Sequence, residues 1–224
     1  MPLLKSLNKE QKEAVLQTDG PLLIIAGAGS GKTMALTHRI AYLIKNKNVS
    51  PFSILAVTFT NKAADEMKNR LEKLTGASSK NIWIGTFHSI CGRILRQDIT
   101  KLGRDNNFVI FDSDDQKSLM KQVLKELNLD IKQYRPNAIL DSISRAKNEL
   151  INEREYAGKA SDLWQEKVAG CYKIYQAKLL KNNALDFDDM LMQAVLLLKN
   201  SPQTAKKYQD RFQYIHVDEY QDTN

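Results

Sequence analysis

The stretch Pro21–Thr33 constrains the fold of this chain more than any other. It reads PLLIIAGAGSGKT, in which a short apolar run, Leu22–Ala26, is followed by a glycine-rich turn. Apolar residues at helical spacing come next in the sequence. A strand, a glycine loop and a helix in this order are the context of a phosphate-binding loop. We therefore expect an α/β protein in which Leu22–Ala26 is a buried strand of a parallel sheet.

The residues of this turn suit a nucleotide phosphate chain. Glycines at alternate positions of Gly27–Gly31 let the backbone curl so that successive N–H groups point inward. Lys32 can reach the β- and γ-phosphates, and the Thr33 hydroxyl can bind Mg²⁺. The helix that begins there adds the positive end of its dipole. The first glycine of the usual pattern is replaced by Ala26, and an ordinary glycine turn is the alternative interpretation.

Composition sets broad limits on the class of protein. A chain of 224 residues with 42% hydrophobic and 26% charged residues is typical of a globular protein with a full core. The net charge of +7 weakly favours a polyanionic partner. The two cysteines form no CxxC pair, which fits a reducing compartment. No apolar run approaches membrane-spanning length, so we expect a cytoplasmic protein without a membrane partner.

Gln11 has two interpretations at this level. Asn8 is a good helix N-cap, and Gln11 follows it at the spacing of a capping box. A glutamine amide also carries a donor and an acceptor side by side, which match the N7 and N6 positions of adenine. Local sequence leaves both open.

Two further strands are expected at Ile54–Phe59 and Ile82–Gly85, and polar and aromatic residues gather where each ends. Ligands of open α/β sheets collect at the carboxyl ends of strands. The groups there suit phosphate contacts and base stacking, and the alternative is a capped helix with a core phenylalanine. These residues are Thr58, Phe59, Thr60, Asn61 and Lys62 after the first strand, and Thr86, Phe87 and His88 after the second.

From Phe108 onward the pattern is helical, until a strand returns at Tyr214–Val217 and ends in Asp218 and Glu219. An apolar strand that ends in two acids is the usual second half of a P-loop enzyme. Asp218 would hold Mg²⁺ and Glu219 would polarise the attacking water. The alternative is a pair of solvated acids at a strand end.

Taken together, the chain resembles the N-terminal part of a superfamily 1 DNA helicase of the UvrD/Rep/PcrA family. The resemblance rests on motifs in a fixed order: Leu7-Asn8…Gln11, Ala26–Thr33, Val57–Met67 (VTFTNKAADEM), Gly85–Ser89 (GTFHS), Asp186–Met190 (DFDDM) and Val217–Asn224 (VDEYQDTN). It implies a RecA-like P-loop NTPase sheet flanked by helices, in residues 1–90 and 212–224. It also implies an inserted all-helical subdomain, residues 91–211, that faces DNA.

The resemblance assigns roles to single residues. ATP binding falls to Gln11, Ala26, Gly27, Ala28, Gly29, Ser30, Gly31, Lys32, Thr33 and Met34. Catalysis falls to Lys32, Asp218 and Glu219, and Mg²⁺ to Thr33 and Asp218. Single-stranded DNA would contact Thr58, Phe59, Thr60, Asn61, Lys62, Thr86, Phe87 and His88. Family members translocate 3′ to 5′ on single strands and unwind partial duplexes, commonly in DNA repair.

Two departures from the family pattern affect these expectations. Met34 stands where the family often has an arginine that stacks on adenine, so a cation–π contact is lost. The arginines of a second motor lobe are absent, so we expect the fragment to bind ATP and DNA without unwinding and to leave a sheet edge exposed. A P-loop small-molecule kinase lacks support, because no arginine-rich lid is seen. A non-catalytic DNA-binding module would not need Lys32, Thr33, Asp218 and Glu219 together.

Overall fold

A computed structural model of the chain describes residues 2–27 and 29–223. Contacts divide the described chain into two compact units. The first, here called the sheet unit, contains the residues up to Ile90 together with Ala205–Thr223. The second, the helical unit, is Cys91–Thr204. The helical unit is therefore an insertion in the sequence of the sheet unit, and by contacts it ends at Thr204, whereas the family resemblance implied an end at residue 211.

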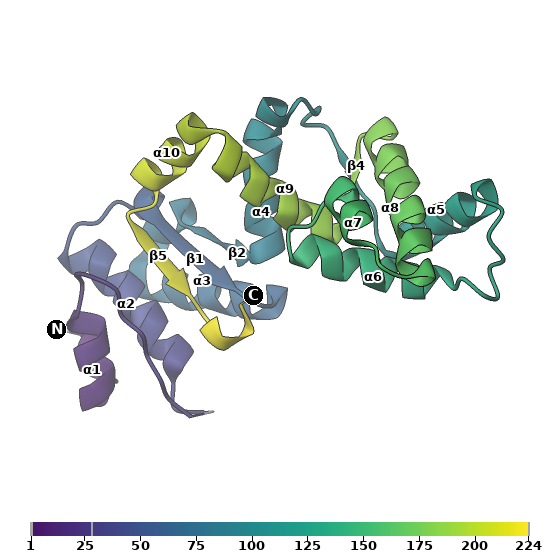
Figure 1. Cartoon of the computed structure of the whole chain (residues 1–224). Helices are drawn as coiled ribbons and strands as arrows, with labels where there is room; N and C mark the ends of the chain where they lie inside the picture. The colour runs from purple at the N-terminus through teal and green to yellow at the C-terminus, as the bar shows by residue number, and fades with distance from the viewer. Residues whose placement is uncertain (1, 28, 224) are drawn as a thin grey trace. The chain divides into compact units, whose positions relative to one another are not determined.

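The sheet unit is built on three parallel strands in the order β2–β1–β5 (Figure 1). Their bounds are Ile54–Thr58 for β1, Trp83–Thr86 for β2 and Tyr214–Val217 for β5. All of β1 is buried, as expected for a strand with a neighbour on each side. Thr58 pairs with Thr86 in one direction, and Val57 pairs with Val217 in the other. The carboxyl ends of all three strands therefore meet at one edge.

Helices α2 (Lys32–Asn46) and α3 (Asn61–Thr75) cover one face of this sheet. Ile40 of α2 and Met67 of α3 form one buried apolar core with Ala56 of β1. Burial of these side chains is the main force that holds the helices on the strands, because apolar surface leaves water. Helix α1 (Lys9–Leu16) precedes this core in the sequence and packs against α2.

Aromatic rings cover the other face of the sheet. Side chains alternate along β2, so Trp83 points away from the α2–α3 core. Its ring lies 6.2 Å from that of Tyr208 and 5.1 Å from that of Phe212. Tyr208 lies near the end of helix α10 (Pro202–Arg211), so the last part of that helix belongs to the sheet unit.

The strand predicted at Leu22–Ala26 is wrong. These residues form no strand, and the side chains of Leu23 and Ile25 are 64% and 87% exposed. Apolar composition predicts burial, but a strand also needs a hydrogen-bonded neighbour. Within the described residues β5 pairs only with β1, and its Ile215 is 61% exposed. The expected exposed sheet edge is therefore present, at β5.

The helical unit is not all-helical, which corrects a second expectation. It holds the later part of α4 and most of the remaining helices: α4 Phe87–Asp98, α5 Ser113–Glu126, α6 Pro136–Asn148, α7 Glu153–Lys159, α8 Leu163–Lys181 and α9 Phe187–Asn200. Two short strands, β3 (Val109–Ile110) and β4 (Ala184–Leu185), pair in parallel. The N–H of Val109 donates to Asn183 O at 2.9 Å, which satisfies backbone groups beside the buried β4. Short 3-10 turns lie at Pro2–Leu4, Pro51–Ser53, Gly76–Asn81, Ile99–Leu102 and Tyr220–Asp222.

A buried charge network lies in the core of the helical unit. Lys147 Nζ lies 2.6 Å from Asp186 Oδ2 and 2.9 Å from Asp189 Oδ1. Tyr175 donates its hydroxyl to Asp186, and Gln176 donates its amide to Asp189. Burial acts to lower the pKa of Lys147, but the two carboxylates outweigh it and the pKa is raised. Burial raises the pKa of Asp189, against the opposing effect of Lys147.

Two other properties of the described residues bear on the expectations. Cys91 and Cys171 are both free, and burial raises the pKa of each thiol to about 11. Each thiol is therefore protonated at neutral pH. No helix in the described part of the chain has both the length and the apolar character needed to cross a membrane.

Candidate functional site

The predicted phosphate loop leads directly into helix α2, which begins at Lys32. Gly31 is the N-cap residue and has φ +85°, while Gly29 has φ +74°. Both values lie in the left-handed region that glycine adopts without steric cost. The N–H of Ser30 donates to Gly27 O at 3.3 Å and closes a tight turn. Ala28, also predicted for this loop, lies outside the described residues.

The side chain of Lys32 is turned onto its own loop. Its Nζ donates to the carbonyl of Ala26 at 2.9 Å and to that of Gly27 at 3.2 Å. Carbonyl oxygens carry partial negative charge and accept hydrogen bonds from an ammonium group, as phosphate oxygens also do. The side chain is half-buried, so a bound anion would compete with these two carbonyls for the same charge.

Thr33 and Asp218 lie far apart in the sequence and are in contact in the structure. Thr33 Oγ1 donates to Asp218 Oδ2 at 3.1 Å. Asp218 follows β5 directly, and its backbone N–H donates to Val57 O of β1 at 2.9 Å. The carboxylate is buried. The sheet therefore fixes the position of Asp218, and the first turn of α2 fixes that of Thr33.

Glu219 has a strained backbone beside this pair. Its φ of +51° and ψ of +52° lie in the left-handed region, which costs a residue with a side chain roughly 1–3 kcal/mol. Its N–H donates to Asp218 Oδ1 at 3.2 Å, and its own carboxylate accepts a hydrogen bond from Gln221. Strained residues of this kind are common at functional sites, because the surrounding contacts must hold them.

His216 lies two residues before Asp218 and is buried. Burial lowers its pKa to about 4, and the neighbouring Arg39 adds to the effect. The imidazole is therefore neutral at pH 7, and within the described residues its Nε2 has no hydrogen-bond partner.

Gln11 contacts the loop as well as its own helix. The capping box is present: Gln11 Oε1 accepts from the Asn8 N–H at 3.1 Å, and Asn8 Oδ1 accepts from the Gln11 N–H at 2.8 Å. In addition, Gln11 Nε2 donates to Ser30 O at 2.9 Å. The structural interpretation of Gln11 is thus confirmed, and its amide also lies beside the phosphate loop.

Met34 packs against a small apolar cluster formed by Leu7, Val15 and Tyr42. It is half-buried there, in the first turn of α2, and the cluster includes Val15 of α1. The residue that stands in place of the family's arginine therefore contributes to the core near Gln11.

The two segments predicted to contact DNA emerge side by side, because Thr58 and Thr86 are paired on adjacent strands. Phe59 is 60% exposed, and Thr60, Asn61 and Lys62 are also exposed. Thr58 differs: it is fully buried, and its hydroxyl donates to Thr60 O at 3.0 Å. Its side chain supports the turn and presents no hydroxyl at the surface.

The remaining predicted positions serve as caps or lie partly buried. Thr60 accepts from the Ala63 N–H and caps α3, as its structural interpretation required. Thr86 directly precedes α4, and its Oγ1 accepts from the N–H of Ser89 in the first turn of that helix at 3.2 Å. The side chains of Phe87 and His88 are half-buried.

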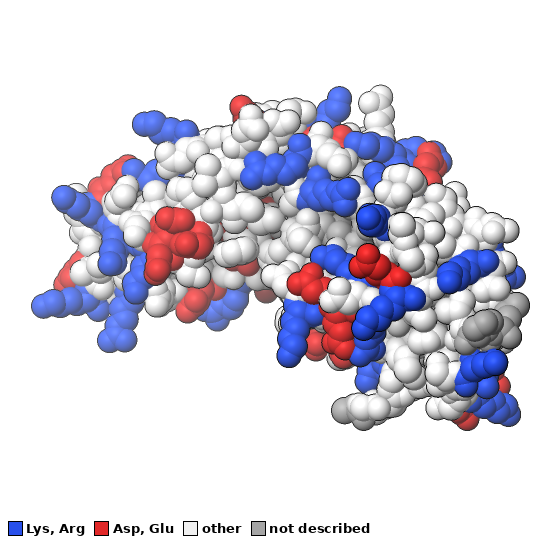
Figure 2. Space-filling view, turned by 180° about the vertical axis from the view of Figure 1, so that it is seen from behind, with Lys and Arg blue, Asp and Glu red and all other residues white. Residues whose placement is uncertain are grey.

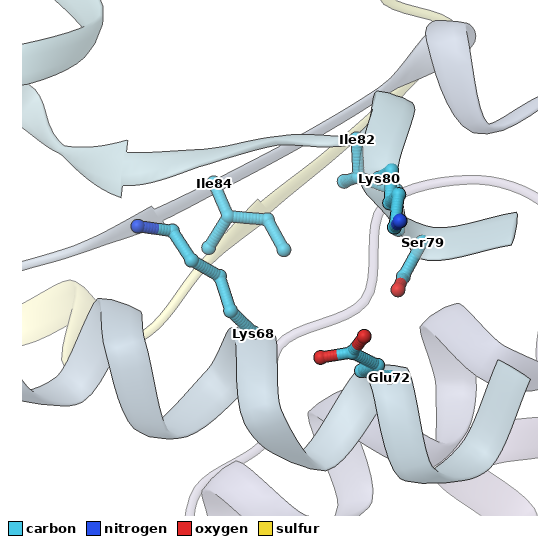
Figure 3. A pocket seen from close by; sticks show the side chains of 6 residues that line it. All are labelled: Lys68, Glu72, Ser79, Lys80, Ile82 and Ile84. Carbon is cyan, nitrogen blue, oxygen red and sulfur yellow. The ribbon is translucent and has the colours of Figure 1, made fainter. Parts of the chain in front are cut away.

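Two cavities lie away from these residues. One, of about 250 Å³, is lined by Lys68 and Glu72 of α3, by Ser79 and Lys80, and by Ile82 and Ile84 beside β2 (Figure 3). The other, of about 900 Å³, lies in the helical unit between α7, α8 and α9. None of the described residues predicted for ATP or DNA lines either cavity. Basic side chains are spread among acidic ones over the face in Figure 2.

Lys147 forms a buried ion pair with Asp186 and Asp189, and the sequence analysis did not predict this role. The Asp186–Met190 motif is part of the family resemblance, and Asp186 is the N-cap of α9. The available signal was a lysine directly after Ile143 and Ala146 on the apolar side of α6. Such a position requires a buried acidic partner.

Comparison with known proteins defines the class of the chain. Residues 7–224 match the sequence model of the UvrD/REP helicase N-terminal domain. The chain therefore belongs to the UvrD/Rep helicase family, and its small parallel sheet with many helices is consistent with that domain.

Particular relatives carry a more specific name. The chain is 55% identical over 222 residues to the ATP-dependent DNA helicase PcrA of Bacillus subtilis. It is 54% identical to the protein of that name from Staphylococcus epidermidis and 53% identical to that from Staphylococcus aureus. Each match covers 99% of this chain and 30% of the relative. The chain thus spans about 30% of the length of these relatives.

Proposed function

We propose that this chain is the ATP- and single-stranded-DNA-binding part of a 3′–5′ DNA helicase or translocase of the UvrD/Rep/PcrA type. The observation that carries the proposal is the hydrogen bond between Thr33 and Asp218 at the carboxyl edge of the parallel sheet. It joins the phosphate loop to the acidic strand end across the sequence. The 54% identity to proteins named ATP-dependent DNA helicase PcrA supports the same interpretation.

The oxygen donors at this edge fit Mg²⁺. The Thr33 hydroxyl and the Asp218 carboxylate are hard ligands, and Mg²⁺ commonly takes one or two protein oxygens while it keeps water and substrate phosphate oxygens. Described residues offer no group of three or more His, Cys, Asp or Glu side chains for a metal, in accord with such a sparse site. When bound, Mg²⁺ neutralises charge on the phosphate oxygens.

The other residues then have distinct roles on ATP. Lys32 exchanges the carbonyls of Ala26 and Gly27 for phosphate oxygens, since both are acceptors for the same ammonium group. Glu219 orients and polarises the attacking water, for which its fixed backbone provides a defined starting position. Gln11 reads the edge of adenine, and Met34 supports that position by packing. A RecA-like fold is part of this proposal.

Single-stranded DNA would lie along the ends of β1 and β2. Phe59 provides an exposed ring for base stacking, while Asn61 and Lys62 provide polar and charged groups for the backbone. The helical unit would lie along the path of a partial duplex. Because the chain spans about 30% of its relatives, we propose that these 224 residues alone bind both ligands but do not unwind DNA.

Two binding measurements on the purified chain test the proposal. ATP should bind in the presence of Mg²⁺, and a single-stranded oligonucleotide should bind with an affinity that falls steeply with salt, because each phosphate contact releases roughly 0.7 counterions. A chain that binds ATP but no oligonucleotide at low salt would contradict the helicase assignment. Transfer of phosphate from ATP to a small-molecule acceptor would support the kinase alternative instead.

A further inference from the structure

We infer that Gln11 is a positioning residue for the phosphate loop, in addition to its proposed contact with adenine. The inference rests on the proposed function, since it concerns how the same loop binds phosphate. Its starting point is the hydrogen bond in which Gln11 Nε2 donates to Ser30 O at 2.9 Å. This bond links helix α1 directly to the loop.

The bond fixes the orientation of one peptide group. In a trans peptide the C=O of one residue and the N–H of the next point in opposite directions. Because Gln11 binds the Ser30 carbonyl, the Gly31 N–H points away from Gln11. Within the described residues this N–H has no hydrogen-bond acceptor. An anion on the side of the loop opposite Gln11 would therefore meet this N–H.

The close approach of Gln11 to Gly31 supports this geometry. A Cβ placed on Gly31 would lie 2.7 Å from Gln11 Nε2, which is closer than real side chains come. The absence of a side chain at Gly31 thus allows the amide of Gln11 to reach the loop. A side chain at residue 31 would also be strained, because its φ is +85°.

The loop needs such a restraint because its own backbone is permissive. Gly29 and Gly31 flank the Ser30 residue, and both adopt positive φ. Glycine reaches both signs of φ at similar cost, so the Ser30–Gly31 peptide can rotate unless something holds it. Gln11 is itself held by the capping box, in which its Oε1 accepts from the Asn8 N–H. The restraint is therefore anchored in a helix terminus.

Inorganic tripolyphosphate separates this role from adenine recognition, because it carries the phosphates and no base. In Gln11→Ala, the Ser30–Gly31 peptide loses its anchor, and we expect tripolyphosphate to bind about three- to tenfold more weakly in calorimetry, the effect of losing one hydrogen bond. ATP should lose at least as much affinity. If Gln11→Ala weakens ATP and leaves tripolyphosphate unchanged, Gln11 only reads adenine and the positioning role is overturned.

Asn8→Ala is the matched control. It removes the other half of the capping box, since Asn8 Oδ1 accepts from the Gln11 N–H, but it leaves the Gln11–Ser30 bond in place. Asn8→Ala removes the N-cap side chain of α1, so it tests the effect of a weakened helix terminus. Tripolyphosphate should bind Asn8→Ala as it binds the unaltered chain. An equal loss in both variants would show that only the helix terminus matters and would overturn the inference.

A spectroscopic measurement follows the peptide itself. Tripolyphosphate should shift the backbone amide resonance of Gly31 in the unaltered chain and in Asn8→Ala, and should shift it less in Gln11→Ala. An undiminished shift in Gln11→Ala would contradict the positioning role even if affinities differed. Failure of the unaltered chain to bind ATP and tripolyphosphate would instead contradict the proposed function, so the two failures are distinguishable.

Discussion

At the scale of single residues, the Asp218 carboxylate contacts Thr33, and we have proposed that it also binds Mg²⁺; the two roles can be separated by experiment. Asp218→Asn retains an oxygen that can accept from the Thr33 hydroxyl but removes the charge. We expect it to weaken ATP binding about tenfold or more in Mg²⁺ and to leave binding in EDTA nearly unchanged, because only the first involves a cation. Calorimetry in both buffers measures the difference. An equal loss in both would assign Asp218 a purely structural role.

Phe59 is the residue whose exposure most directly supports DNA binding. Phe59→Ala should weaken binding of a single-stranded oligonucleotide by roughly 1–3 kcal/mol, the value of one base–aromatic stack. Phe52→Ala is the matched control, because Phe52 is 54% exposed and precedes β1 at the end of the sheet opposite Phe59. Fluorescence anisotropy at low salt compares the two. Similar losses in both variants would remove Phe59 from the proposed DNA path.

At the scale of elements, the Lys147 network shows how α6 and α9 are held together. Lys147→Met would leave Asp186 and Asp189 buried without their cation, and we expect a loss of about 3–5 kcal/mol in the free energy of unfolding at pH 7. Lys178→Met is the control, because the Lys178–Glu126 pair, at 2.9 Å, is partly exposed. That variant should lose less than about 1 kcal/mol. Urea unfolding measures both.

The same network gives a pH dependence with a defined sign. The pKa of Asp189 is higher in the folded chain than its ordinary value, mainly because of burial, and Lys147 opposes the shift. A carboxyl of this kind binds its proton more tightly when folded, so its ionisation lowers stability as pH rises through that range. Without Lys147 the pKa must rise further. The loss of unfolding free energy in Lys147→Met should therefore be smaller near pH 4.5 than at pH 7. An equal loss at both pH values would show that the destabilisation does not come from the unpaired carboxylates.

Elements were predictable from sequence where local pattern and long-range pairing agreed. Tyr214–Val217 is a strand as predicted, and β1 ends one residue before its expected bound. Leu22–Ala26 failed because its apolar pattern gives no information about whether a paired neighbour exists. The short helix α7 was missed because seven residues, Glu153–Lys159, carry too little periodicity.

The candidate site also contains features that could be predicted from the sequence and features that could not. The loop, the acids and the two strand ends could be located from residue types, because parallel strands bring their carboxyl ends to one edge. The bond from Gln11 to Ser30 and the buried position of Thr58 could not, since both depend on the course of turns that have no periodic pattern. The role of Lys147 was not predicted because its partners, Asp186 and Asp189, follow it only after two helices, α7 and α8, and their connections.

At the scale of the whole molecule, the chain should bind its ligands but turn over little ATP. Transition-state arginines supplied by another part of an NTPase are typically worth about 10³–10⁵ in rate. The 224-residue chain, with or without single-stranded DNA, should therefore hydrolyse ATP slowly in a phosphate-release assay. Rapid, DNA-stimulated ATP hydrolysis would show that these 224 residues are sufficient for catalysis.

The pairing of Ile54 with Tyr214 in the central sheet has a consequence for how the chain is made. During synthesis β1 emerges early, but β5 emerges only after the whole intervening unit, so one side of β1 stays bare in the meantime. Pairing between strands distant in sequence forms slowly, and an unpaired strand edge can pair with another chain and aggregate. The inserted helices, whose contacts are nearer in sequence, can complete their own core first. We therefore expect the core of the helical unit to form before β5 joins the central sheet.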